Sequence, residues 1–113
     1  MAVPIANCLV HDQLRAEFDG DALTALWSEE SGIGSEQMTI NVIASIRQYG
    51  APYRVMAFLY LPSLWKSEQV RKLQTGLARA LGRGFAVAPA EIQVITSMVE
   101  SGQVVEGGET QDW

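Results

Sequence analysis

Cys8 and His11 are the side chains that most directly suggest chemistry in this chain of 113 residues. A cysteine and a histidine can form an activated nucleophile, and both can bind zinc. The chain has one of each, so they cannot complete a tetrahedral zinc site, and no internal disulfide can form. A spacing of three residues at the end of one apolar run does not provide the opposed geometry that a nucleophile and its base need. We expect both residues to be structural, and we expect no metal ion and no cofactor.

Basic residues stand where an anion would bind. Arg47 and Arg54 flank a turn that also carries Tyr49 and Tyr53, a grouping able to clamp a planar acid. Lys66 precedes a predicted helix, and a helix N-terminus attracts anions through its dipole and its free N–H groups. The alternative for each of these cations is a solvated charge on the surface.

The balance of charge restricts the class of partner. The chain carries 13 acidic and eight basic residues, which gives a formal net charge of −5. Binding of nucleic acid depends on Lys and Arg that neutralise phosphates, so we expect no nucleic-acid partner. Nothing in the sequence holds two acidic groups in one dry pocket, so we expect a solvated acidic face formed by Glu17, Asp19, Asp21, Glu29 and Glu30.

The hydrophobic pattern predicts no membrane association. No apolar run approaches the roughly 20 residues that a membrane-spanning helix needs. The first residues lack the basic stretch of a secretion signal. A single cysteine fits a reducing compartment, so we expect a cytoplasmic protein.

The first half of the chain, residues 1–50, has a β-α-β pattern. The apolar run over 3–10 predicts a strand. Apolar residues at helical spacing predict a short helix over 22–30, and partial alternation predicts a second strand over 38–46.

The second half, residues 51–113, repeats this order. A strand is predicted over 53–61, followed by a helix with Ser67 as its N-cap and a stop at Gly82. A last strand is predicted over 91–99. Beyond it we expect a turn, a short apolar pair and a polar tail.

The two halves resemble imperfect copies of one unit, because residues 4–10 match residues 55–61 in pattern. Two β-α-β units with right-handed crossovers predict a single α/β (α+β) domain over 1–113, with a four-stranded sheet and two helices on one face. The other face of the sheet also carries apolar residues, and an oligomer would supply its cover. We expect the three tryptophans, Trp27, Trp65 and Trp113, to be packing or subunit-contact residues.

Three stretches of the sequence carry a resemblance to a known family. Residues 4–6 read Pro-Ile-Ala, residues 61–69 read Leu-Pro-Ser-Leu-Trp-Lys-Ser-Glu-Gln, and residues 88–109 hold a final strand and a closing Gly-Gly-Glu. In this order and spacing they resemble the tautomerase superfamily, which contains 4-oxalocrotonate tautomerase, carboxymethyl-hydroxymuconate isomerase and macrophage migration inhibitory factor. The second half matches along its whole length, and the first half matches at its strand ends.

The resemblance implies a homotrimer with active sites at the opening of the first strand. In this family an N-terminal proline is the general base of a keto-enol tautomerase or isomerase, and basic side chains hold the carboxylate and the enolate of an enolisable keto acid. Pro4 takes the place of that proline, and Lys66 takes the place of a carboxylate-binding cation. Arg15 is the pseudo-symmetric partner of Lys66, and Gln93 falls near the place where some members have an arginine.

Pro4 departs from the family pattern, because three residues precede it and its nitrogen is therefore an amide without a basic lone pair. Removal of Met1 would leave Ala2 as the terminal amine, with an ordinary pKa of about 7.7 to 8.0. In an extended strand that amine lies roughly 6 to 7 Å from the proline position. We expect Pro4 to be catalytic only as the first residue, with Ala2 as the alternative amine.

The leading hypothesis is a tautomerase-like protein with a pocket for a small carboxylate or keto acid and with weak or absent tautomerase activity. The substrate-binding candidates are Lys66, Arg15, Arg54, Arg47, Tyr53 and Gln93. One alternative is a catalytically silent member that binds a ligand or serves assembly. Another is a ferredoxin-like sensor domain, in which the second and third strands would be adjacent and antiparallel.

Overall fold

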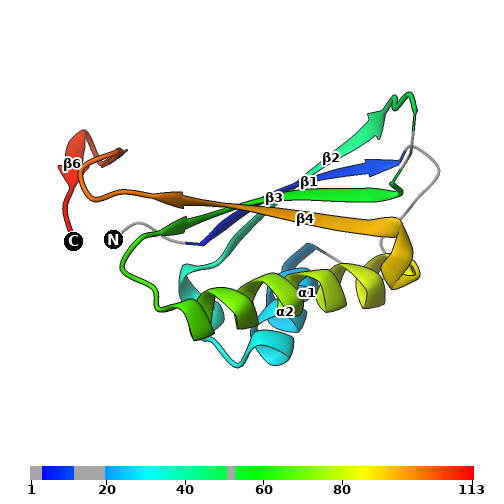
Figure 1. Ribbon diagram of the computed structural model, residues 1–113, viewed down its shortest axis with the longest axis horizontal. Coiled ribbons are helices and arrows are strands. Elements are labelled where there is room, and N and C mark those ends of the chain that lie inside the picture. Colours follow the sequence, from blue (N-terminus) through cyan, green and yellow to red (C-terminus); the bar gives the residue numbers. More distant parts are fainter. Residues whose placement is uncertain (1–3, 12–19, 51–52) are drawn as a thin grey trace.

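The computed structural model describes residues 4–11, 20–50 and 53–113. Its main sheet has four strands in the order β2-β1-β3-β4 (Figure 1). Their bounds are Ile5–His11 for β1, Thr39–Ile46 for β2, Val55–Pro62 for β3 and Ile92–Val99 for β4.

The pairing of the strands distinguishes between the predicted topologies. β1 runs parallel to β2, β3 runs parallel to β4, and the central pair β1 and β3 is antiparallel. This is the predicted tandem β-α-β arrangement. The ferredoxin-like alternative is wrong, because β2 lies at an edge of the sheet and pairs with β1, not with β3.

Two helices cover one face of this sheet, α1 (Gly20–Ser31) and α2 (Ser67–Phe85) (Figure 1). Two short 3₁₀ helices lead into strands, η1 (Ser35–Gln37) before β2 and η2 (Pro89–Glu91) before β4. The predicted fold class, a mixed α and β protein with two helices on one face of four strands, is therefore confirmed.

The core lies between the helices and the sheet. Alternate residues of β1 and β3 are buried, as the period of two in a strand requires: Ala6, Cys8, Val10, Val55, Ala57, Leu59 and Leu61. Trp27 of α1 is fully buried, and its Nε1 donates a hydrogen bond to the carbonyl oxygen of Leu73 in α2 over 3.0 Å. This bond joins the two helices inside the core, so Trp27 is the packing residue that we predicted.

The start of α2 differs from the prediction by one residue. Lys66, not Ser67, is the N-cap, and its backbone N–H donates to Oε1 of Gln69 over 3.1 Å. Gln69 thus accepts, from within the helix, a hydrogen bond from the backbone N–H of the N-cap residue, as the N3 side chain of a capping box does.

The predicted turn and apolar pair after β4 belong to a small hairpin, and the residues beyond them, which we expected to be a polar tail, form its second strand. β5 (Val104–Glu106) and β6 (Glu109–Gln111) pair antiparallel. The turn between them places Gly107 and Gly108 at φ of 62° and 80°, a conformation that favours glycine and makes the tightest hairpins. Beyond the hairpin, Trp113 Nε1 donates to Ser63 Oγ over 2.9 Å and so attaches the end of the chain to the loop after β3.

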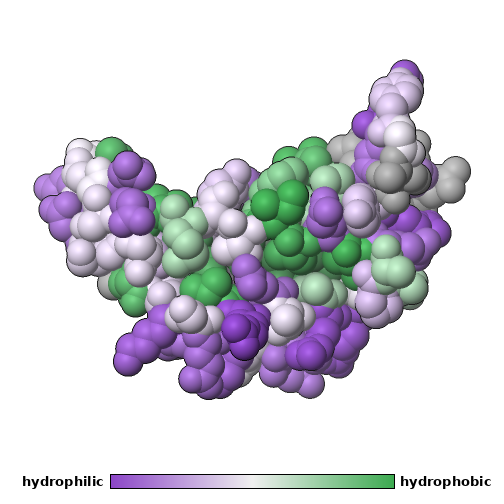
Figure 2. Space-filling view, viewed as in Figure 1, coloured by the Kyte–Doolittle hydropathy of each residue, from purple (hydrophilic) through white to green (hydrophobic). Residues whose placement is uncertain are grey.

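The face of the sheet opposite the helices is largely apolar, and no described helix covers it. In Figure 2 the hydrophobic surface lies along the sheet, above the hydrophilic outer sides of the helices, and this side of the molecule is concave. One polar pair interrupts it, in which Asn41 Nδ2 donates to Asn7 Oδ1 over 2.8 Å. The apolar side chains that share the face are Ile5, Leu9, Ile43, Met56, Phe58, Tyr60, Ile95 and Val99. Among the helices of the described residues, none is long and apolar enough to cross a membrane.

We expect Gly76→Ala to destabilise the protein. A Cβ on Gly76 would lie 2.9 Å from the backbone N, Cα and Cβ of Ser31, where α2 crosses the end of α1. Alanine favours an isolated helix by about 1 kcal/mol over glycine, but we expect the clash to dominate and to lower the free energy of unfolding by about 1–3 kcal/mol. Urea denaturation measures this change.

Thr75→Ala, on the exposed side of the same helix, is the control and should change stability by less than about 0.5 kcal/mol. Equal stabilities of Gly76→Ala and the unmodified chain would show that the two helices can separate without cost.

Candidate functional site

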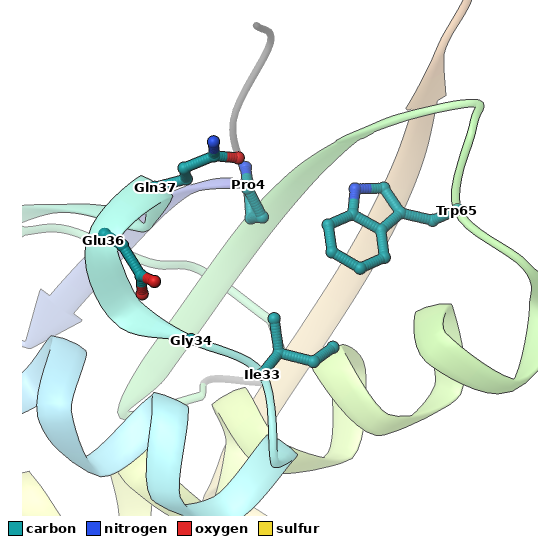
Figure 3. Close-up of a pocket in the computed structure, with 6 residues that line it drawn as sticks. All are labelled: Pro4, Ile33, Gly34, Glu36, Gln37 and Trp65. Carbon is teal, nitrogen blue, oxygen red and sulfur yellow. The ribbon is translucent and has the colours of Figure 1, made fainter.

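A cavity of about 210 Å³ opens at the start of β1 (Figure 3). Three segments form it: the residue before β1, the connection from α1 to β2, and the loop from β3 to α2. The residues that line it are Pro4, Ile33, Gly34, Glu36, Gln37 and Trp65.

Pro4 is held in this cavity by the pairing of β1 with β2. Its carbonyl oxygen accepts a hydrogen bond from the backbone N–H of Thr39 over 3.0 Å, which extends the ladder by one residue. Its side chain is fully buried. In the chain as encoded its nitrogen is an amide, so Pro4 contributes an apolar surface here and no base.

Trp65 forms the wall opposite Pro4. Figure 3 shows its indole ring extending from the loop after β3 toward Pro4 and Ile33. Its backbone N–H donates to the carbonyl oxygen of Pro62 over 3.3 Å, which closes a turn at the end of β3. Its indole Nε1 is buried, and none of the described residues accepts a hydrogen bond from it.

Glu36 contributes the one carboxylate among the described residues that line the cavity. It belongs to η1, and its side chain folds back over Gly34 (Figure 3). A Cβ on Gly34 would lie 2.5 Å from Glu36 Oε2, so the absence of a side chain at position 34 leaves room for this pose.

Lys66 directly follows the cavity residue Trp65 in the sequence, but its side chain is exposed and does not line the cavity. Its backbone caps α2, as described above. Its predicted role as a carboxylate-binding cation stays a prediction.

The other described candidates lie toward the opposite end of the sheet. Arg54 directly precedes β3, and the first residue of β3 pairs with Val10 near the end of β1, so Arg54 lies at the end of β1 that is far from Pro4. Arg47 directly follows β2, and because β2 runs parallel to β1, it lies at the same end. Tyr53 is bound by Gln48, whose side chain accepts from its N–H and donates to its carbonyl oxygen. Gln93 pairs with Met56 on the open face. Within one protomer the structure therefore does not bring these residues together with Pro4.

Two candidates, Ala2 and Arg15, lie outside the described residues, so their predicted roles stay predictions.

Sequence reasoning missed Ile33, Glu36 and Gln37, because the segment after the first helix was interpreted as a helix stop alone. One signal was available. Parallel strands in a β-α-β unit begin at the same edge of the sheet, so the residues that lead into the second strand must lie near Pro4.

Cys8 and His11 lie on opposite faces of β1, so they do not pair with each other. Cys8 is buried in the core, and burial raises the pKa of its thiol from 9.0 to about 12. Among the described residues no group of three or more His, Cys, Asp or Glu is placed to hold a metal ion.

Comparison with known proteins gives a result for structure and not for sequence. No protein-family model matches the sequence, and no curated protein matches it. The structure of a native fused 4-OT superposes with a TM-score of 0.71 at 14% identity, over 94% of both chains. The macrophage migration inhibitory factor of Oncomelania hupensis superposes with a TM-score of 0.70 at 15% identity, over 98% of this chain and 97% of that one.

A third similar structure is N1, a member of the cis-3-chloroacrylic acid dehalogenase family, with a TM-score of 0.66 at 14% identity over 95% of this chain and 82% of that one. This chain has the fold of the tautomerase superfamily. The predicted resemblance is thereby confirmed at the level of the fold. The cavity at Pro4 lies at the opening of the first strand of this tautomerase fold, where the resemblance predicts the active site.

The thiol of Cys8 makes stability depend on pH in the alkaline range. Because burial raises the pKa of this thiol in the folded state, the unfolded chain loses the proton first as pH increases above about 9. The free energy of unfolding then falls by about 1.4 kcal/mol per pH unit. The fall ends near pH 12, where the folded thiol also ionises. Below pH 9 the thiol has no effect. We expect urea denaturation at pH 8 and pH 10 to show a larger loss of stability in the unmodified chain than in Cys8→Ala. The same loss in both chains would contradict the prediction.

Proposed function

We propose that this tautomerase-fold protein binds a small enolisable carbonyl compound, of the class to which keto acids belong, in the cavity at the start of β1. We propose further that it catalyses keto-enol tautomerisation only where Pro4 is the first residue. One observation carries the proposal: the buried ring of Pro4 lines a cavity whose other walls include Ile33 and Trp65.

The environment of Pro4 suits a general base once its nitrogen is an amine. The apolar walls that bury the Pro4 ring disfavour the charged form of an amine and lower its pKa toward neutrality, where a base transfers protons most effectively. The Glu36 carboxylate acts in the opposite direction through its charge, but it is exposed, so solvent screens its effect. A similar solved structure, with a TM-score of 0.73 at 12% identity, is described as a protein inactivated by 2-oxo-3-pentynoate, which is itself a 2-keto acid. This supports a carbonyl compound as the ligand class for the fold.

The test compares the encoded chain with a chain that begins at Pro4. We expect the chain that begins at Pro4 to convert the enol of an aryl pyruvate to its keto form about 10²-fold faster or more, because only its proline nitrogen can accept a proton. Ultraviolet absorbance of the enol measures the rate. As control, acetylation of the new N-terminus should return the rate to that of the encoded chain. Equal rates in both chains would contradict a role for Pro4.

A second candidate function is ligand binding without catalysis, which the amide nitrogen of Pro4 in the encoded chain favours. Loss of the base removes the mechanism and leaves the cavity intact. This candidate predicts that the encoded chain binds a carbonyl ligand in calorimetry and shows no turnover.

We also propose that the protein is a homotrimer, assembled through the open face of the sheet. The apolar side chains on this face have no cover in a single protomer, and Ile95 and Ile43 are 44% and 47% exposed. Exposed apolar patches of this kind mark interfaces. A fused 4-OT of similar structure is described as a symmetric trimer, with a TM-score of 0.74 at 11% identity.

Sedimentation equilibrium tests the assembly. We expect three times the protomer mass for the unmodified chain and a lower mass for Ile95→Asp, because a charge on this face would be buried without a partner. Leu64→Asp is the matched control, since Leu64 is also 44% exposed but lies in the loop after β3, and it should leave the mass unchanged. A monomeric unmodified chain would exclude the trimer.

A further inference from the structure

We infer that the protein has a second ligand site, at the C-terminal end of α2, and that this site binds a small aromatic carboxylate. A cavity of about 330 Å³ lies there, larger than the cavity of about 210 Å³ at Pro4. Its lining comes from the end of α1, the last turns of α2 and the segment that leads into β4. The two cavities share no lining residue, so the second site goes beyond the proposed function.

The second cavity lies at the end of the sheet that is far from Pro4. Figure 1 shows the end of α2 beside the start of β4. Ile92, the first residue of β4, lines the cavity and pairs with Val55 at the start of β3. Pro4 lies beside the end of β3 instead, because the next residue, Ile5, pairs with Tyr60. Since the cavity is on the helix side of the sheet, covering the open face does not cover it.

The floor of this cavity is apolar. Ala78 and Gly82 contribute the surface of α2, and Val87, Pro89 and Ile92 contribute the surface of the segment after it. A Cβ on Gly82 would lie 3.2 Å from the carbonyl oxygen of Val87 and 3.4 Å from Cδ1 of Ile92. The glycine therefore allows this segment to pack closely against the helix, which makes the floor continuous. An apolar group of a ligand gains free energy by leaving water for such a surface.

Arg79 is the cation of this cavity that is available to a ligand. Three charged side chains line the cavity, those of Glu30, Arg79 and Arg83. Arg83 Nη1 lies 3.7 Å from Oε2 of Glu30 and 3.5 Å from Oε1 of Glu29, so Arg83 offsets the charge of Glu30. Arg79 is exposed and pairs with no carboxylate among the described residues.

An apolar floor beside a free guanidinium fits an aromatic carboxylate. Guanidinium binds a carboxylate through two parallel hydrogen bonds, and its plane also stacks on aromatic rings. A ring that lies on the floor next to Ala78 brings its carboxylate within reach of Arg79. A cationic ligand would meet a like charge there, and a neutral ligand would gain the floor alone. The volume is at the lower end of the range of about 300–1,000 Å³ that is usual for ligand pockets, so the ligand is small.

Titration of the complete encoded chain with cinnamate, followed by heteronuclear NMR of the backbone N–H groups, tests the site. Cinnamate has no enolisable carbonyl, so it is not a substrate of the kind proposed for the Pro4 cavity. We expect saturable shifts at Gly82, Val87 and Ile92 with a Kd on the order of 1 mM. The N–H of Thr39, which donates to the Pro4 carbonyl oxygen, reports on the other cavity. Cinnamamide, with the same ring and no charge, should bind at least about fivefold more weakly.

Three variants separate the guanidinium from the floor. Arg79→Gln should weaken binding of cinnamate by about fivefold and change binding of cinnamamide by less than about twofold. Arg71→Gln is the matched control, since Arg71 is also exposed on α2 but does not line this cavity, and it should change neither affinity. Ala78→Leu fills the floor and should weaken both ligands by about fivefold or more.

The position of the shifts decides between the two cavities. Shifts at Thr39 without shifts at Gly82, Val87 and Ile92 would overturn the second site and leave the function proposed for the Pro4 cavity standing. Equal affinity for cinnamate and cinnamamide, or equal losses in Arg79→Gln and Arg71→Gln, would overturn the selection of a carboxylate. The comparison of the two ligands on the unmodified chain carries the test even where a variant does not fold.

Discussion

The close packing of α1 against α2 is the constraint on which the cavity depends. α1 ends at Ser31, and this residue lies so close to Gly76 of α2 that position 76 has no room for a side chain. Gly32 then reverses the chain at φ 74°, and Ser28 Oγ donates to the carbonyl oxygen of Ile33 over 2.6 Å. These contacts fix the direction in which residues 33–37 leave the helix. The segment that carries Glu36 therefore owes its place beside Pro4 to an interhelical contact elsewhere in the core.

The directions of the central strands bring the two halves of the chain to one site. Because β1 and β3 are antiparallel, the start of β1 lies beside the end of β3, and Ile5 pairs with Tyr60. Pro4 from the first half therefore meets Trp65, which follows β3 in the second half. The same antiparallel pairing places Arg54 at the far end of β1.

The chemistry of the cavity differs from what the cations of the sequence suggest. Its described lining has apolar walls and one carboxylate, whereas the basic candidates lie outside it. Cys8 lies in the core with a raised thiol pKa, so it adds no nucleophile. The fold can hold such a cavity whether or not Pro4 has a free amine, because the buried ring and the Pro4 carbonyl take part in packing and pairing independently of catalysis.

The sequence by itself determined the four main strands and two helices, their tandem order and the resemblance in fold. Period-two burial in β1 and β3 and the apolar stripe of α2 are local patterns, so they could be predicted to within a few residues. The hairpin at Gly107 and Gly108 was missed although its turn residues are local, because the strands that it joins have only three residues each. Only the tertiary structure decided that Glu36 and Trp65 line the cavity at Pro4 and that Arg54 lies at the other end of β1. Periodicity reports which side of its own element a residue occupies. Which residues meet at one site is decided by strand order, strand direction and helix packing, because these act between segments far apart in the chain.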